Sequence, residues 1–235
     1  MNSRKILISA PLAVLAALLP AASAGGASTQ DLDAWAYPQL AAQVRSQPSN
    51  SASSISKLHF LTELRAPEVY RVTARTQGQD GDHQNWLRID VLGRPNGRVG
   101  WVPESALGSL HQITETLVIN RSSLRAVLFK GKRRLWSAPV GIGRGKWPTP
   151  PGDFYIREAI RIKRGNGVYG SFAFGTSAYS PSLSDWPGGG VIGIHGTNEP
   201  KLIPGRISHG CIRVTNPQIN RLKRLAGVGT AVEIR

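Results

Sequence analysis

Apolar and polar residues alternate with a period of two along much of this chain, and this pattern restricts its fold more than any other sequence feature. The pattern is clearest in WLRIDVLGRPNGRVGWVP (86–103), where β-forming residues lie on both sides of Asn96-Gly97. Asn-Gly is the strongest short hairpin signal, because both central residues of a type I′ turn need a positive φ. VYRVTART (69–76) alternates in the same way. The alternation predicts a protein made mostly of β-strands.

The second half of the chain continues the pattern. Residues 116–143 alternate, with a hairpin expected at Gly131. VIGIH (191–195), CIRV (211–214) and the closing TAVEIR (230–235) are further expected strands. The sequence therefore predicts a second β-rich domain over residues 111–235.

One short helix is expected near the C-terminus. In NPQINRLKRLAG (216–227), Asn216 is the expected N-cap and Pro217 the first helical residue. Apolar residues then recur on one face, and Gly227 ends the helix.

The N-terminus indicates export. Arg4 and Lys5 precede an apolar run over residues 6–19, and Ala22-Ser23-Ala24 matches the small-x-small pattern of a cleavage site. We interpret residues 1–24 as a signal peptide, with an uncleaved anchor as the alternative. The protein is therefore expected in the periplasm or the cell wall.

The region after the signal peptide divides into a linker and a small module. Residues 25–56 are rich in Ala, Ser, Gln and Asn, and we interpret them as a linker that contains a possible short helix at 31–45. Residues 57–110 form the module. Its GWVPESAL (100–107) resembles the last strands of bacterial SH3-like modules, which are small β-barrels common beside cell-wall enzymes. Such a module either binds wall polymer or serves as a rigid spacer.

The charge of the chain restricts its partners. Its formal net charge is +15, and the loss of Arg4 and Lys5 with the signal peptide leaves +13. This excess attracts anionic polymers at long range, and for an exported protein these are cell-wall polymers or a membrane surface. The alternative is merely a soluble basic surface. No basic run is interleaved with aromatic residues, so we expect no nucleic-acid binding.

Cys211 is the only cysteine, so it has no partner for an internal disulfide. In an exported protein such a thiol is a small buried apolar group, an intermolecular bridge or a nucleophile. Alternation in CIRV places Cys211 and Arg213 on one face and the apolar Ile212 and Val214 on the other. A cysteine of the core would share the apolar face, so the pattern favours a nucleophile.

His195 is the expected partner of this thiol. In VIGIH, alternation places His195 and Gly193 on one face, opposite two isoleucines. A Gly- and Pro-containing loop follows and returns the chain, so that the strands ending at His195 and starting near Cys211 can lie side by side. An imidazole within reach of a thiol can accept its proton and activate it.

The residues around the cysteine suggest acyl transfer. Gly210 allows a close approach of the backbone, and the amides of residues 210–211 are candidates to hold an oxyanion. Arg213 carries a planar guanidinium that suits a carboxylate. This set suits a peptide whose scissile bond lies near a free carboxylate. A papain-like enzyme is excluded, because that class places the cysteine before the histidine and no histidine follows Cys211 here.

HGTNEPKLIPGRISHGCIRV (195–214) resembles the signature of the L,D-transpeptidase (YkuD) catalytic domain, and PTPPGDFYI (148–156) and the C-terminal GTAVEI also resemble that family. The resemblance implies that Cys211 is the nucleophile and His195 the proton acceptor and donor. It implies further catalytic positions at Ser208, His209 and Gly210. It also implies substrate binding by Arg213, Gly196 and Thr197.

The family activity implied by this resemblance is transpeptidation without a cofactor. The thiolate attacks the carbonyl of the third, diamino-acid residue of a peptidoglycan tetrapeptide stem, and the terminal D-alanine leaves. An amine on a neighbouring stem then accepts the acyl group to form a 3→3 crosslink, whereas water as the acceptor makes a carboxypeptidase. Acylation by carbapenems is also implied, and we expect a monomer.

Two other interpretations compete. His195, His209 and Cys211 supply donor atoms that suit zinc, but their spacing matches no structural zinc motif and no fourth ligand is evident, so we predict no metal. A non-catalytic wall-binding protein is the other alternative, and the intact signature argues against it. Tyr169 and Trp186 either line the substrate cleft or only pack.

Overall fold

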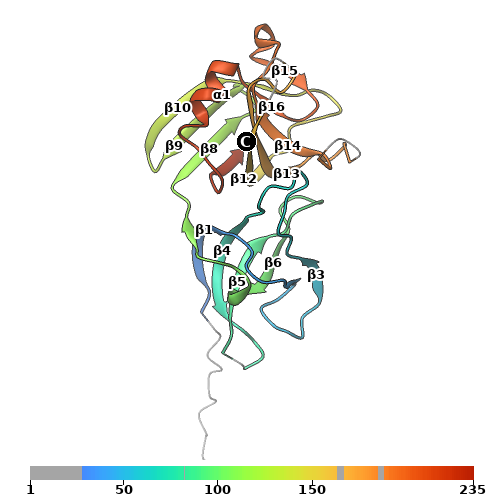
Figure 1. Ribbon diagram of the computed structural model, residues 1–235, viewed down its shortest axis with the longest axis vertical. Coiled ribbons are helices and arrows are strands. Elements are labelled where there is room, and N and C mark those ends of the chain that lie inside the picture. The colour runs from blue at the N-terminus through green and yellow to red at the C-terminus, as the bar shows by residue number, and fades with distance from the viewer. Residues whose placement is uncertain (1–27, 82, 163–166, 185–187) are drawn as a thin grey trace, which may run out of the picture.

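The structure is a computed structural model that describes residues 28–81, 83–162, 167–184 and 188–235. It consists of two β-rich lobes arranged along the long axis of the molecule, the N-terminal lobe at the bottom of Figure 1 and the C-terminal lobe at the top. The expected signal peptide and Trp186 lie outside the described residues. Among the described residues, no helix has the length and apolar character that crossing a membrane requires.

The N-terminal lobe is built on one seven-stranded sheet with the strand order β3-β2-β6-β5-β4-β1-β7. A short 3-10 helix, η1 (Glu104–Ala106), follows β6. The strands are β1 (Gln30–Ala36), β2 (Gln43–Arg45), β3 (Ser54–Lys57), β4 (Tyr70–Gln77), β5 (Asn85–Asp90), β6 (Val99–Pro103) and β7 (His111–Gln112). The SH3-like character of this lobe stays a prediction.

The first three strands lie in the segment that the sequence analysis assigned to a linker, and the possible helix at 31–45 is also wrong. β1 pairs with β4, and β2 pairs with β6, so both strands belong to the sheet. Their inward residues Ala36 and Val44 are buried in the core of the lobe. Composition did not reveal these strands, because a strand that is buried on one side needs few apolar residues and carries polar residues on its outer face.

The Ser- and Asn-rich stretch of the expected linker is an ordered turn. Asp80 accepts a hydrogen bond from Ser49 Oγ at 2.5 Å and another from the Asn50 amide at 2.5 Å. The turn is therefore fixed by a carboxylate thirty residues further along the chain, which local sequence does not indicate.

The predicted hairpin at 86–103 is confirmed, but its turn differs from the expected one. β5 and β6 pair antiparallel with Asp90 opposite Val99. Gly97 has φ +80°, whereas Asn96 is not among the residues with positive φ, so the turn is not type I′. The Asn96 side chain instead binds the backbone of Tyr179 in the other lobe, donating to its carbonyl and accepting from its amide at 2.8 and 2.9 Å.

The C-terminal lobe is a ten-stranded sheet with the order β10-β9-β8-β17-β12-β13-β14-β16-β11-β15. Its strands are β8 (Glu115–Asn120), β9 (Arg125–Lys130), β10 (Arg133–Pro139), β11 (Gly141–Gly143), β12 (Gly152–Arg161), β13 (Phe172–Tyr179), β14 (Val191–His195), β15 (Gly205–Ser208), β16 (Ile212–Arg213) and β17 (Ala231–Ile234). The predicted hairpin at Gly131 is confirmed. The predicted closing strand is β17, which lies between β8 and β12.

The predicted C-terminal helix is α1 (Asn216–Leu222), and a 3-10 helix, η2 (Pro200–Leu202), lies in the loop after β14. Ile219 and Leu222 of α1 are fully buried against the core of the lobe, as the periodicity predicts. The N-cap is Thr215 rather than Asn216, whose side chain is used elsewhere.

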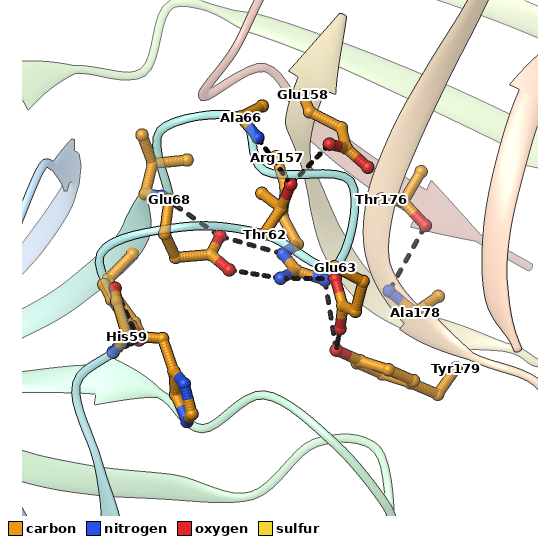
Figure 2. A network of polar contacts seen from close by, with 12 residues as sticks. His59, Thr62, Glu63, Ala66, Glu68, Arg157, Glu158, Thr176, Ala178 and Tyr179 are labelled. Atoms are coloured by element: carbon orange, nitrogen blue, oxygen red, sulfur yellow. Dashed lines mark hydrogen bonds and ion pairs between the residues drawn. The ribbon is translucent and has the colours of Figure 1, made fainter. Parts of the chain in front are cut away.

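Strand β12 holds the two lobes together. Its residues from Phe154 to Glu158 are all buried, because one face of the strand packs in its own core and the other meets the N-terminal lobe. On the second face, the Tyr155 hydroxyl donates to the Val69 carbonyl at 3.0 Å. Arg157 donates through Nε to Glu68 Oε1 at 2.9 Å and forms a second contact with Glu68 Oε2 (Figure 2).

Loss of the Glu68 carboxylate is expected to cost about 3 to 5 kcal/mol of unfolding free energy, because Arg157 and Glu68 are 2% and 1% exposed and a buried charge would lose its main partner. Glu68→Ala, measured by urea unfolding, tests this expectation. Glu104→Ala is the matched control, since it removes the partner of Arg75 from a partly exposed ion pair and should cost at most about 1 kcal/mol. Equal losses in the two variants would contradict the assignment.

Candidate active site

Cys211 follows a tight turn between β15 and β16, and two hydroxyl groups fix this turn. Ser208 Oγ accepts a hydrogen bond from the Gly210 amide at 3.1 Å and donates to the Cys211 carbonyl at 2.6 Å. Thr149 Oγ1 donates to the Gly210 carbonyl at 2.6 Å. Sequence reasoning gave no role to Thr149, although it lies in the PTPPGDFYI segment that carries part of the family resemblance.

The turn requires glycine at position 210. Gly210 has φ +119°, a conformation that residues with a Cβ rarely adopt. A Cβ there would also lie 2.9 Å from Ile192 Cδ1. The Gly210 amide is engaged by Ser208. Of the two amides expected to hold an oxyanion, the Cys211 N–H is therefore the remaining candidate.

The predicted pairing of the two strands that carry His195 and Cys211 is confirmed. β14 and β16 run parallel, with Ile194 opposite Ile212 and His195 opposite Arg213. Both isoleucines are buried in the core of the lobe, so the opposite face carries the polar groups, as the alternation predicts. In a parallel pair of strands, residues directly opposite each other point their side chains to the same face of the sheet, so His195 and Arg213 share a face.

Gly193 leaves an open position that both the thiol and the imidazole border. A Cβ on Gly193 would lie 3.8 Å from Cys211 Sγ and 3.8 Å from His195 Cδ2, so both groups border the same position. The Gly193 amide donates to Sγ at 3.4 Å. Sequence reasoning predicted the space but not this hydrogen bond, which stabilises the sulfur when it carries negative charge.

The structure fixes the tautomer of His195. Its Nδ1 lies 2.6 Å from the Gly196 carbonyl, which can only accept, so Nδ1 carries the proton and Nε2 is the acceptor. The edge-on Tyr169 ring lies 4.9 Å away between centroids and limits ring rotation. Tyr169 lines the cleft, as one of the two interpretations predicted.

Both reacting groups are held in their neutral forms. Burial lowers the pKa of His195 to about 4, and the Arg213 charge contributes to the same shift. Burial raises the pKa of the Cys211 thiol above its ordinary value, against the opposing effects of the Gly193 amide and Arg213. Both shifts favour a neutral thiol beside a neutral imidazole over a thiolate–imidazolium pair.

Arg213 lies beside the thiol on the polar face, as predicted. Its ion-pair partner is a residue that the sequence did not indicate. Its guanidinium forms an ion pair with Glu199 at 3.2 Å, from the loop after β14. Its Nε is buried and has no hydrogen-bond partner within the described part of the chain. One terminal nitrogen of the guanidinium is therefore bound to Glu199, while the Nε–H is a donor without a partner among the described residues.

Gly196 and Thr197, expected to bind substrate, make contacts that position the site. The Gly196 carbonyl orients His195, and the Thr197 hydroxyl accepts from the Glu199 amide at 3.1 Å. Asn216 bridges this loop to the segment just before β13, donating to the Thr197 carbonyl and accepting from the Ser171 amide, both at 3.1 Å. The helix start thus ties together the loops on both sides of the imidazole, which sequence reasoning missed.

His209 lies at the rim of the site, apart from the chemistry at His195. Its ring packs against Trp147 with centroids 4.2 Å apart and the ring planes tilted by 51°, and its Nε2 lies 3.4 Å from Arg144. Arg144 and Lys146 also lie over the Trp147 ring. This places His209 in a basic aromatic cluster at the mouth of the cleft.

These groups surround a cavity of about 200 Å³, referred to below as the first cavity. Its lining includes Tyr169, His195, His209, Cys211 and Arg213. Within the described residues, no three or more His, Cys, Asp or Glu side chains are gathered in a way that could hold a metal ion. A thiol, a base and a guanidinium around one cavity suit attack on a carbonyl close to a carboxylate.

The comparisons with known proteins assign the C-terminal lobe to a family. Residues 114–234 match the family model of the YkuD L,D-transpeptidase catalytic domain. The chain belongs to this family. The match runs from the residue before β8 to the end of β17 and so covers all strands of the C-terminal lobe. The family resemblance predicted from residues 195–214 is therefore confirmed.

Curated relatives carry the same name. A Bacillus subtilis protein named as L,D-transpeptidase YkuD is 38% identical over 96 residues, which cover 41% of this chain and 51% of the relative. Its namesake in Bacillus licheniformis is 34% identical over 116 residues, covering 49% and 61%. The chain thus spans about half to three-fifths of the length of these relatives. An L,D-transpeptidase crystal structure from Mycobacterium tuberculosis aligns with a TM-score of 0.47 and 13% identity, over 85% of this chain and 98% of that chain.

Proposed function

We propose that this protein is an exported cysteine transpeptidase that acts on peptidoglycan tetrapeptide stems. The observation that carries the proposal is that Cys211 Sγ and the His195 ring both border Gly193 and line one cavity that also contains Arg213. Family membership supports the activity, and the sequence of residues 1–24 supports export.

The acylation half-reaction uses the neutral pair. His195 Nε2 takes the thiol proton as Cys211 Sγ attacks the carbonyl carbon of the third stem residue, and the Cys211 N–H binds the oxyanion. The imidazolium then gives this proton to the departing nitrogen of D-alanine, the C–N bond breaks and a thioester remains. Arg213 binds the free carboxylate of the donor stem.

Mass spectrometry of the products formed from a purified disaccharide tetrapeptide tests the function. We expect release of D-alanine and the appearance of dimers joined through two third residues. Tripeptide products alone would show hydrolysis and contradict transpeptidation. No release of D-alanine at all, with folded protein, would contradict the proposed activity as a whole.

A further inference from the structure

A second cavity of about 230 Å³ opens on the same thiol and imidazole. It shares Cys211 and His195 with the first cavity, but one of its walls comes from the N-terminal lobe, through Glu63 and Leu64. Strand β12 contributes Glu158 to the lining, together with apolar residues of β12 and β13. The catalytic pair therefore lies between two cavities, and the second one is completed by a separate module.

The Glu63 side chain is fixed by the C-terminal lobe. Its Oε2 lies 3.1 Å from the Arg157 guanidinium, and its Oε1 accepts from the Tyr179 hydroxyl at 2.5 Å (Figure 2). Burial alone would raise the pKa of Glu63, but the Arg157 charge and these hydrogen bonds hold it below its ordinary value, so the carboxylate is ionised at neutral pH. The side chain keeps 33% of its surface exposed.

The loop that carries Glu63 and Leu64 is also anchored at both ends. Thr62 donates through its hydroxyl to Glu158 Oε2 at 2.7 Å, and Glu68 pairs with Arg157 (Figure 2). The Glu158 side chain needs a glycine at position 175, because a Cβ on Gly175 would lie 2.6 Å from Glu158 Oε1. The wall is therefore a preformed part of the cavity.

The two cavities differ in charge. The first contains Arg213, whereas the lining of the second includes the carboxyl groups of Glu63 and Glu158 and, among the described residues, no Lys or Arg side chain, because the Arg157 guanidinium that pairs with Glu63 lies outside it. This excess of acid is local, because the whole chain has a net charge of +15. Leu64, 56% exposed, adds an apolar surface beside the carboxylate. A cationic group on an alkyl chain complements such a wall, and an anionic or purely polar group does not.

We propose that the second cavity binds the acyl acceptor, a primary amine at the end of an aliphatic side chain, and that the N-terminal lobe selects it through Glu63 and Leu64. The inference rests on the proposed function, since it assigns the second substrate of the same thioester. The donor stem then occupies the first cavity, and the N-terminal lobe is part of the active site.

The acceptor binds as an ammonium and releases one proton to solvent before it reacts. The free amine then attacks the thioester carbonyl, His195 Nε2 takes a proton from the attacking nitrogen, and the C–S bond breaks. His195 gives this proton to the departing Cys211 sulfur, so the products are a new amide, the neutral thiol and the neutral imidazole.

The test measures the two half-reactions of the full chain separately, with D-alanine release reporting acylation. The transfer step is followed with two acceptors, a diaminopimelate-containing tripeptide and hydroxylamine, which is small and uncharged at neutral pH. For Glu63→Gln we expect about a tenfold rise in the KM of the tripeptide and less than a twofold change for hydroxylamine. Leu64→Lys, at an exposed position, places a cation on the same wall and should raise the tripeptide KM similarly.

Glu104→Gln is the matched control, because Glu104 pairs with Arg75 on the N-terminal lobe and lines neither cavity. An unchanged tripeptide KM in both wall variants would overturn the inference. An equal rise for hydroxylamine would also overturn it, because a general distortion of the site would then explain the loss. Absence of D-alanine release in the unmodified protein would instead count against the proposed function.

Discussion

Cys211→Ala is expected to abolish both D-alanine release and covalent labelling by a carbapenem, with a fall in turnover of at least about 10⁴-fold. The reason is that no second thiol exists in the chain and the acyl-enzyme needs a covalent acceptor. Intact-protein mass spectrometry provides the measurement. The unmodified protein should gain one adduct and the variant none.

The lone cysteine makes the control for this experiment direct. Titration with a thiol reagent under denaturing conditions should give one equivalent in the unmodified protein and none in the variant. The neighbouring turn is held by Ser208 and Thr149 through backbone groups, so the variant should keep the melting temperature within a few degrees. Retained turnover in a folded Cys211→Ala protein would eliminate the cysteine mechanism.

His195→Ala should lower the rate of acylation by about 10² to 10⁴-fold, because the neutral imidazole is the group that takes the thiol proton. His209→Ala is the comparison variant. Its ring lies at the rim against Trp147, so we expect less than a tenfold loss. Losses of similar size in the two variants would contradict the assignment of His195 as the base.

The pH profile provides an independent readout of the same group. A base with a pKa of about 4 stays neutral at all higher pH values, so acylation should be retained as the pH falls through 6.5 and decline only near 4. On the alkaline side, alkylation of Cys211 by iodoacetamide should keep rising above pH 9, because burial raises the thiol pKa. An acid limb near 6.5, or a reactivity plateau at pH 7, would instead indicate a thiolate–imidazolium pair.

Local sequence was sufficient to predict which side chains of the two strands around His195 and Cys211 face the core. Alternation in VIGIH and CIRV predicted which residues face the core, and Ile192, Ile194, Ile212 and Val214 are indeed buried there. The same argument predicted that His195 and Cys211 share a face, and the parallel pairing of β14 and β16 confirms it. These predictions succeed because a strand places successive side chains on opposite faces whatever its partner is.

Local sequence was not sufficient where the decisive contact comes from a distant residue. The expected linker is three strands, because pairing with β4 and β6 buries its few apolar residues. Asn96 was expected to have the positive φ of a type I′ turn and instead binds Tyr179 of the other lobe. Asn216 was expected to cap a helix and instead joins two loops beside His195.

The sequence by itself therefore determined the β-rich character of the chain and predicted Cys211 and His195 as nucleophile and base, since these follow from residue identity and the two-residue period of a strand. Tertiary structure alone decided what surrounds them. It paired Arg213 with Glu199, buried Arg157 against Glu68, and brought Glu63 of one lobe to the cavity of the other. Each of these contacts joins positions far apart along the chain or in separate elements, and no local pattern encodes which distant side chain will meet them.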